Sequence, residues 1–450
     1  MQPAAAGGAP ARPFEIDLRM IAAIAVPMTL AYMTTPILGL VDTAVVGRLG
    51  DPALIGGLAV GAVLVNLIFT TFNFQRSGTT GLTAQALGAG DETEKQAILM
   101  RALILAGAAG VIMVLLSPLI LAIGLWFMTP GRAVAEATGQ YFTIRMLSAP
   151  FALANYAVLG WLIGLGRTGL GLALQFLLNG TNIVLSVVLG LWLGYGIAGV
   201  AWATVAAEVL AAGAGLVLCR ALIIHRALPS RAQVMAMAAW RRLVNLNGDI
   251  MVRSFALLFA FAFFTAQGAR YGEVTLAANA VLMHFFIIGG YFLDGLATAA
   301  EQIIGRALGA RYRAGFVRGF RLTLTLNVGL AMALTAVYLV AGPWLIAVIT
   351  TLESVRAEAG AYLWLAALTP LTGVLAFQMD GVYIGATWSR EMSRMMLVSI
   401  AIYLITWWLM RDSLANTGLW LALHAFLVSR GVTLSLMLRP RLRTAFPPPA

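Results

Sequence analysis

The chain has 450 residues, of which 61% are hydrophobic and only 10% charged, and its formal net charge is +11. A soluble globular domain carries about 25% charged residues, so this composition excludes an ordinary soluble protein. Apolar runs of helical length recur along the whole chain, as transmembrane helices require and transmembrane β-strands do not. We therefore expect an all-α integral membrane protein.

Twelve apolar runs are long enough to cross a hydrocarbon core of about 30 Å. They cover residues 18–46, 54–80, 97–125, 139–164, 169–193, 197–221, 243–267, 274–300, 320–349, 360–386, 392–411 and 415–438. The first run is long and continuous enough to be a span, so no separate cleavable signal is expected. Residues 1–17 are predicted to form a disordered cytoplasmic N-terminus, and residues 439–450 a cytoplasmic tail.

Basic residues are distributed unevenly around these runs. An even number of spans leaves both termini on one side of the membrane, and most of the 29 Lys and Arg residues fall on that side. The opposite side receives only Arg48, Arg132, Arg145, Arg270, Arg356 and Arg411. By the positive-inside rule both termini are cytoplasmic. The positive charge thus reflects membrane topology, and we expect the lipid bilayer, not nucleic acid, as a partner.

The sequence contains no recognisable catalytic or metal-binding motif. A single cysteine, Cys219, cannot form an intrachain disulfide and is expected to be a buried, inert thiol. The three histidines have no metal-ligand spacing, and no protease, esterase or P-loop motif occurs. We expect neither a catalytic residue, nor a bound metal, nor a cofactor.

The two halves of the chain resemble each other at a near-constant offset. "ALGA" at 86–89 returns at 307–310, and Pro150 corresponds to Pro370. The further matched pairs are Gly160 with Gly381, Ile163 with Ile384, and Gly164 with Gly385. The offset spans six runs, so an N-lobe (18–221) and a C-lobe (243–438), joined by a cytoplasmic linker (222–242), should be related by an axis along the membrane normal. Such pseudosymmetry favours alternating access.

Ionisable residues inside spans indicate function by default. Asp42 lies in the first run, Asp294 and Glu301 in or near the eighth, Asp380 in the tenth and Glu208 in the sixth. The structural alternative for each is a carboxylate that is paired with an arginine or hydrogen-bonded to hold helices together.

Uncharged polar residues form two stripes at helical spacing. One consists of Asn66, Thr70, Asn73 and Ser77, and the other of Gln175, Asn179, Asn182 and Ser186. Amide stripes in a membrane must face other helices or water. Together with Asp42 and Thr204 they suggest a hydrated N-lobe cavity, although packing between helices is the alternative.

Ion coupling would follow from such a cavity. A low dielectric favours the neutral form of a carboxyl group, so a buried acid can carry a proton. Amide, hydroxyl and carboxylate oxygens could instead hold Na⁺. Methionine and aromatic side chains such as Met33 would add adaptable surface for lipophilic cations.

Several motifs resemble the multidrug and toxic compound extrusion (MATE) family, specifically its DinF-like branch. They are PILGLVDTAVVGRLG (36–50), SGTTGLTAQALGAGD (77–91), RMLSAPFALANYAVLGWLIG (145–164), NGDIMVRS (247–254) and MDGVYIGAT (379–387). The resemblance covers about residues 18–440. It implies twelve helices in two pseudosymmetric six-helix bundles, a V shape, and efflux of organic, often cationic, drugs in exchange for H⁺ or Na⁺.

The resemblance also implies roles for individual residues. Asp42 matches the acidic coupling-ion site of the first helix, Asn182 and Thr204 match N-lobe polar ligands, and Pro27 matches a proline whose bend is linked to protonation. The substrate-cavity candidates are Met33, Asn66, Thr70, Asn73, Gln175, Asn179, Asp294 and Asp380.

One position departs from the branch. Its members commonly read NIVLD, whereas this chain reads NIVLS, with Ser186 in place of a second acid. A Na⁺ site would lose a charged ligand, so we expect H⁺ coupling by Asp42 with Ser186 as a neutral neighbour.

We expect a monomer in the bacterial inner membrane. A flippase of lipid-linked saccharides or other amphiphiles, in the same superfamily, is the alternative function; it would require a more cationic cavity than Arg76, Arg145 and Arg430 supply. A membrane-embedded enzyme is a remote third possibility, since no nucleophile–base constellation occurs.

Overall fold

The protein is a bundle of long helices. The computed structural model describes residues 14–223 and 228–447, and no strand occurs among them. Residues 1–13, 224–227 and 448–450, which belong to the predicted N-terminus, linker and tail, lie outside the described residues.

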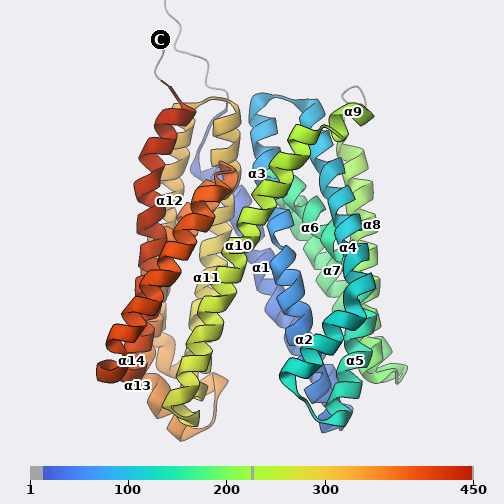
Figure 1. The fold of residues 1–450 in the computed structure, drawn as a ribbon, viewed down its shortest axis with the longest axis vertical. Helices are drawn as coiled ribbons and strands as arrows, with labels where there is room; N and C mark the ends of the chain where they lie inside the picture. The colour runs from blue at the N-terminus through green and yellow to red at the C-terminus, as the bar shows by residue number, and fades with distance from the viewer. Residues whose placement is uncertain (1–13, 224–227, 448–450) are drawn as a thin grey trace, which may run out of the picture.

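Two groups of helices stand side by side, with the first half of the chain at the right of Figure 1 and the second half at the left. The N-lobe contains α1 (Leu18–Gly47), α2 (Pro52–Phe72), α3 (Phe74–Ala89), α4 (Glu92–Met128), α5 (Arg132–Met146), α6 (Ala149–Gly164), α7 (Thr168–Val187) with a π-helical turn at Val188–Trp192, and α8 (Gly196–Leu222). The C-lobe contains α10 (Met237–Gly268) with a short helical turn at Ala269–Tyr271, α11 (Glu273–Gly309), α12 (Arg313–Ile349), α13 (Glu353–Gly385) and α14 (Ser389–Ala445). The short α9 (Arg231–Val234) precedes α10.

These helices account for the twelve predicted spans. Among the described residues, ten helical segments are long and apolar enough to cross a membrane, and the pair α5 and α6, bent by 51°, makes an eleventh. The 57 residues of α14 would extend about 85 Å, far more than one crossing needs. Its backbone is non-helical at Ala415, and the chain there turns back on itself (Figure 1). α14 thus contributes two spans, and the all-α class is confirmed.

The predicted segment ends differ from the structure. Ile16, within the predicted disordered N-terminus, is 2% exposed and packs beside Ala299 and Ile303, and the Asp17 carboxylate caps α1 by accepting from the Met20 N–H at 2.7 Å. α10 begins inside the predicted linker, and α14 continues into the predicted tail. Helices extend past the apolar stretch because polar residues continue them outside the bilayer, where hydropathy no longer marks them.

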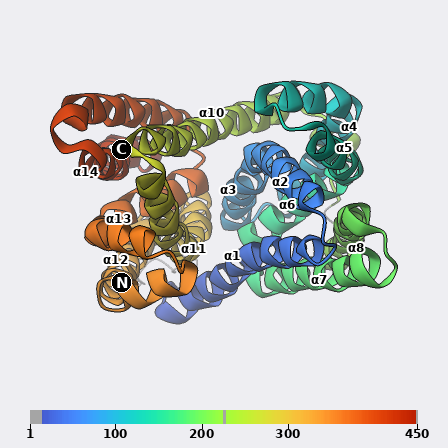
Figure 2. The ribbon, with the colours of Figure 1, turned by 90° about the horizontal axis from the view of Figure 1, so that it is seen from below.

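Two helices cross from one lobe to the other. The first half of α1 packs against α11, and its second half lies beside α7 and α8 (Figure 2). α10 does the converse: its first half contacts α3, where Asn247 lies against Gly78, and its second half joins α14. Each lobe therefore carries one helix whose beginning belongs to the interface with the other lobe.

Glycines on α3 and α11 bring the backbones of the two lobes into direct contact. A Cβ at Gly88 would collide with the carbonyl oxygen of Arg306, and a Cβ at Gly309 would collide with that of Gln85. These two contacts exchange under the 221-residue offset, so the pseudo-two-fold axis passes between α3 and α11. Only glycine lets two backbones come this close.

Side chains reinforce this closure. Gln85 Nε2 donates to the Gly385 carbonyl at 2.9 Å, and Arg242 Nη2 donates to Gln85 Oε1 at 2.7 Å. From the other lobe, Gln302 Nε2 donates to the Gly164 carbonyl at 3.4 Å. The lobes are thus closed at the end where α3 and α11 finish.

Adding a methyl group at this contact should destabilise the closed arrangement. Overpacking of a tight contact costs about 1–3 kcal/mol, so Gly88→Ala and Gly309→Ala should each lower the thermal unfolding midpoint of the detergent-purified protein. The matched control is Gly360→Ala on α13, where a Cβ meets nothing within 4 Å. Equal midpoints for all three variants would contradict the role of the contact.

Candidate functional site

A hydrogen-bonded chain of buried side chains lies inside the N-lobe. Asp42 on α1 is 8% exposed, and Ser186 Oγ lies 2.9 Å from its Oδ1. The same hydroxyl lies 3.1 Å from Asn182 Oδ1, and Asn182 Nδ2 donates to Thr204 Oγ1 at 2.8 Å. The structure therefore brings together Asp42, Ser186, Asn182 and Thr204, which the sequence proposed as one ion-coupling group.

Local helix geometry explains this arrangement. Ser186 and Asn182 are four residues apart on α7, so they share one face. Thr204 Oγ1 donates to the Val200 carbonyl at 3.2 Å, which anchors the far end of the chain to α8. Asp42 itself sits among the apolar side chains that form the N-lobe core, including the buried Val45 and Val46.

The Ser186 hydroxyl has two acceptors within reach but one proton. When Asp42 is ionised, that proton is best given to the carboxylate, because hydrogen bonds to charged groups are stronger. When Asp42 is protonated, its O–H can donate to Ser186, which then donates to Asn182. Both protonation states of Asp42 thus find a hydrogen-bond partner in this chain, with the direction of the bonds reversed between them.

Glu208 is held differently. Asn155 Nδ2 donates to Glu208 Oε2 at 2.6 Å, and Arg145 lies 3.8 Å from its other oxygen. Arg145 also stacks over the Phe69 ring at 5.0 Å. Glu208 is thus a paired carboxylate that joins helices, which is the structural alternative considered for it in the sequence analysis.

Pro27 lies inside α1 without ending it. Proline has no N–H, so the carbonyl of Ala23, four residues earlier, loses its helical donor. Thr168 at the start of α7 supplies a replacement, its hydroxyl donating to that carbonyl at 2.8 Å. The sequence analysis missed Thr168, because its partner is a backbone carbonyl on another helix, 145 residues away in the sequence.

A cavity of about 320 Å³ lies between the lobes. Of the predicted substrate residues, Thr70, Asn73, Asp294 and Asp380 line it. Gln175 lines a neighbouring cavity of about 180 Å³, which shares Thr70, Asn73 and Arg76 with the first.

The remaining three candidates, Met33, Asn66 and Asn179, line neither of these two cavities. Asn179 is buried and donates to Thr34 Oγ1 at 2.6 Å, so it joins α7 to α1. Asn66 and Met33 are exposed. The first stripe continues from α2 across the break at Asn73 into α3, and its last three residues line the larger cavity; of the second stripe, Gln175 lines the smaller one.

Asp380 is paired with two arginines through one of its oxygens, while its Oδ1 has no hydrogen-bond partner in the described part of the chain. Arg253 and Arg430 both donate to its Oδ2, the second at 2.7 Å, and Asp380 and Arg430 are 6% and 3% exposed. The sequence analysis did not single out Arg253, although it lies inside a predicted apolar run. Asp380 therefore fits the structural alternative, an acid paired with basic side chains.

Three other ionisable side chains at the cavity are less committed. Asp294 faces the cavity and, among the described residues, makes no ion pair within 4 Å. Arg76 donates to Asn73 Oδ1 at 3.2 Å and to Ser77 Oγ at 3.3 Å, while its Nη1 has no hydrogen-bond partner in the described part of the chain. Glu301 is 2% exposed and its Oε1 is likewise unpartnered there.

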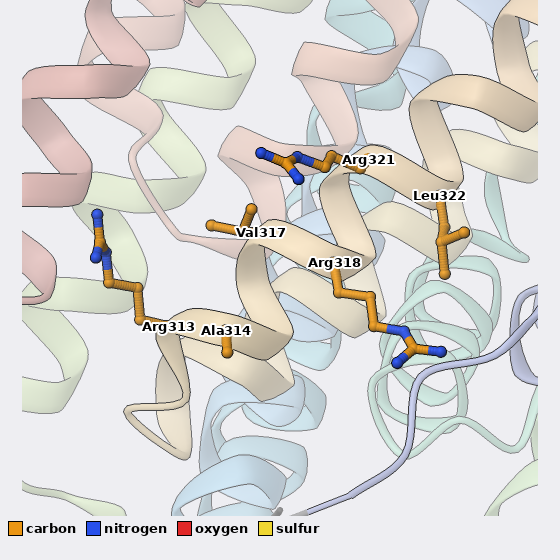
Figure 3. A pocket seen from close by; sticks show the side chains of 6 residues that line it. All are labelled: Arg313, Ala314, Val317, Arg318, Arg321 and Leu322. Atoms are coloured by element: carbon orange, nitrogen blue, oxygen red, sulfur yellow. The ribbon is translucent and has the colours of Figure 1, made fainter.

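A third, larger hollow of about 840 Å³ lies at the start of α12. Figure 3 shows that its lining comes from this one helix and that Arg313, Arg318 and Arg321 point in different directions. Such diverging guanidinium groups do not converge on one ligand. This hollow belongs to the charged beginning of α12.

Removing the Asp380 carboxylate should destabilise the protein more than removing Asp294. Breaking a buried ion pair from one side costs about 3–5 kcal/mol, because Arg253 and Arg430 would be left unpaired. We expect Asp380→Asn to lower the thermal midpoint well below that of Asp294→Asn, its matched control in the same cavity. Similar midpoints would show that Asp380 is not a structural anchor.

Comparisons with known proteins agree with this geometry. The MatE family model matches residues 27–188 and 250–409. The chain is 39% identical over 424 residues to DNA damage-inducible protein F of Escherichia coli, covering 93% of this chain and 92% of that protein. It is 29% identical over 328 residues to a probable multidrug resistance protein NorM of Caulobacter vibrioides, covering 69% and 66%.

Solved structures show the same fold. The bent form of the Vibrio cholerae MATE transporter VcmN superposes with a TM-score of 0.85 at 19% identity, over 95% of this chain and 97% of that one. Together with the matched family model, these findings establish that the chain belongs to the MatE family, the multidrug and toxic compound extrusion transporters, and is a membrane transporter and not an enzyme.

Proposed function

We propose that this transporter exports organic compounds in exchange for protons, with Asp42 as the coupling carboxylate. The observation that supports this most is the buried chain from Asp42 through Ser186 and Asn182 to Thr204. It offers one acid whose hydrogen-bonded chain of neutral partners suits both of its protonation states. The relatives named as multidrug resistance proteins favour drugs as substrates.

A single carboxylate with amide and hydroxyl neighbours favours H⁺ over Na⁺. Loading a proton makes the group neutral, which suits an apolar surrounding. Loading Na⁺ at Asp42 requires the cation to give up water for the weaker neutral ligands of Ser186, Asn182 and Thr204. No further cofactor is needed.

α1 can connect a change in the protonation of Asp42 to a change in the shape of the cavity. Its second half carries Asp42, and its first half packs against the C-lobe, where Tyr32 lies 2.9 Å from Thr298, a cavity residue. Pro27 lies between Asp42 and the start of the helix. A change in hydrogen bonding at Asp42 that shifts α1 would therefore alter the wall of the cavity.

The proposed setting is the bacterial inner membrane, with both termini cytoplasmic and the chain acting as a monomer. In this orientation the end closed by Gly88 and Gly309 is the cytoplasmic one. Substrate would leave from the opposite end of the cavity, and a proton would enter the N-lobe from there.

Replacing the coupling acid should abolish exchange. We expect Asp42→Asn in proteoliposomes to lose substrate-driven proton flux, measured with an internal pH dye, because the amide cannot carry a proton. The control is Asp412→Asn, whose side chain is 87% exposed and lies outside both interior sites. Undiminished proton flux in Asp42→Asn would reject the assignment.

Adding a second acid should change the coupling ion. Ser186→Asp would place two carboxylates within hydrogen-bond distance, and like charges that close favour a bound cation. We expect an imposed Na⁺ gradient, without a pH gradient, to drive efflux in Ser186→Asp but not in the wild type or in Ser186→Ala. A Na⁺ response in the wild type would contradict H⁺ coupling.

The alternative, a flippase for lipid-linked saccharides, requires a cationic cavity. The cavity contains Arg76 and Arg430, as that hypothesis expected, but Arg145 lies in the N-lobe beside Glu208. The three arginines of the cavity are matched by three acids. The geometry therefore favours efflux, and loss of a surface glycan on deletion would favour the flippase.

A further inference from the structure

We propose that α13 is a hinge of the C-lobe that bends at Pro370, and that the His424 side chain holds this helix straight by bridging the two sides of the proline. The hinge is independent of the coupling ion and of the ligand that the central cavity binds. The hydrogen bonds around Pro370 and a difference between the two repeated halves support it.

Pro370 interrupts the hydrogen bonding of α13, although the helix continues through it from Glu353 to Gly385. Because proline has no N–H, the Ala366 carbonyl loses its helical donor, and a helix is commonly kinked at such a point. The Thr369 hydroxyl donates to the Ala366 carbonyl at 2.6 Å and replaces the missing bond. The helix around the proline therefore depends on side chains for hydrogen bonds that it otherwise supplies itself.

The His424 side chain, on the second half of α14, joins the two parts of α13. Its Nε2 lies 3.1 Å from the Leu365 carbonyl oxygen, before the proline, and its Nδ1 lies 2.8 Å from the Thr372 hydroxyl, after it. A carbonyl oxygen only accepts, so Nε2 carries the proton and Thr372 donates to Nδ1. His424 is 9% exposed and forms no ion pair within 4 Å in the part of the chain that the structure describes. Both ring nitrogens are thus used by α13, one on each side of Pro370.

The N-lobe has a different geometry at the equivalent proline. Pro150 corresponds to Pro370, and there the chain forms two helices, α5 and α6, which are bent by 51°. The offset of 220 residues that relates these prolines also relates Arg145 to Leu365. The Arg145 carbonyl accepts from Ser148 Oγ of its own segment at 2.9 Å, whereas the Leu365 carbonyl accepts from α14. The two halves therefore show a bent and a straight form of one sequence position.

The residue equivalent to His424 accounts for this difference. It is Thr204, related by the same offset, which accepts a hydrogen bond from Asn182 and donates to the Val200 carbonyl. Among the described residues Thr204 makes no hydrogen bond to α5 or α6. The bent pair of helices lacks the bridge and the straight helix has it, as expected if the imidazole holds α13 straight.

A bend at Pro370 would change the wall of the central cavity. The second half of α13 is fixed against α11, since a Cβ at Gly381 would collide with the Ala297 carbonyl oxygen. The first half is therefore the part that moves. Its Leu365 belongs to the same hydrophobic core as Phe286, which lines the cavity. α13 would then do for the C-lobe what the proline-bearing α1 is proposed to do for the N-lobe.

The distance between two nitroxide labels tests the hinge. Labels at Gly360→Cys, where a Cβ meets nothing within 4 Å, and at Asp412→Cys, whose native side chain is 87% exposed, are placed on the full chain with Cys219→Ala in lipid nanodiscs. Gly360 lies about 15 Å before Pro370 along the helix, so a bend of 51° would displace it by about 13 Å. Double electron–electron resonance measures the distribution of distances.

We expect the labelled wild-type chain to show mainly the distance of the straight helix. His424→Leu removes both hydrogen bonds and should raise the population of a second, shifted distance about tenfold or more. His424→Gln should behave like the wild type, because its amide can donate to Leu365 and accept from Thr372. The control His284→Leu, at an exposed histidine of α11, should also leave the distribution unchanged.

Replacing the proline separates a hinge from a purely structural role of His424. Pro370→Ala restores the missing N–H, so His424→Leu combined with Pro370→Ala should keep the straight-helix distance. Pro370→Ala alone should stay folded but export ethidium from proteoliposomes several-fold more slowly than the wild type, because α13 no longer bends easily. If His424→Leu does not fold, Thr372→Val removes one of the two bonds and should raise the shifted population by a smaller factor.

An unchanged distance distribution in both His424→Leu and Thr372→Val would overturn the proposal. Ethidium export by Pro370→Ala at the wild-type rate would show that α13 does not bend during transport, and would overturn it as well. No ethidium export by the wild type would instead count against the proposed efflux of cations, and the measured distances would then decide the hinge.

Discussion

The hydrocarbon interior of a membrane supplies no partner for a polar group, and the positions of the polar side chains in this protein follow from that constraint. Two of the places where they gather are the chain that begins at Asp42 and the cavity between the lobes. In the first, one acid is hydrogen-bonded to a chain of neutral donors and acceptors. In the second, acids and arginines compensate one another. The first arrangement suits a group that gains and loses a proton, and the second suits groups that stay ionised.

α1 connects these two places. The same helix bears Asp42, contributes Tyr32 to the cavity wall and packs its first residues against the opposite lobe. Its proline removes one internal hydrogen bond, which Thr168 restores from α7. A helix whose continuity depends partly on a side chain of another helix can bend when that side chain moves. The coupling proposed here therefore requires no long pathway through the protein.

Hydropathy predicted the helical class, and the 221-residue offset predicted two related halves. Helical spacing, which groups residues on one face of a single helix, predicted residues that lie near Asp42. The sequence did not predict how far Asp380 is neutralised, because Arg253 and Arg430 reach it from α10 and α14, which are distant in sequence. Asn66 lines neither interior cavity for a similar reason, since periodicity identifies a face of a helix but not its neighbour. Met33 was expected at a cavity on its residue type alone, which does not say where the side chain lies. Thr168 was missed because its partner is a backbone atom, which no side-chain pattern reveals.

The contacts of Gly88 and Gly309 have a consequence for the conformations that the transport cycle passes through. Each lobe contributes a glycine and a carbonyl oxygen from equivalent positions of its own half: Gly88 and Gln85 in the N-lobe, and Gly309 and Arg306 in the C-lobe. Separating the lobes at this end therefore breaks both contacts together. A half-open state would keep one contact while straining the other. This end of the protein should then populate two conformations, one with both glycine contacts formed and one with both broken. Binding of a substrate or a proton needs only to shift the equilibrium between these two conformations.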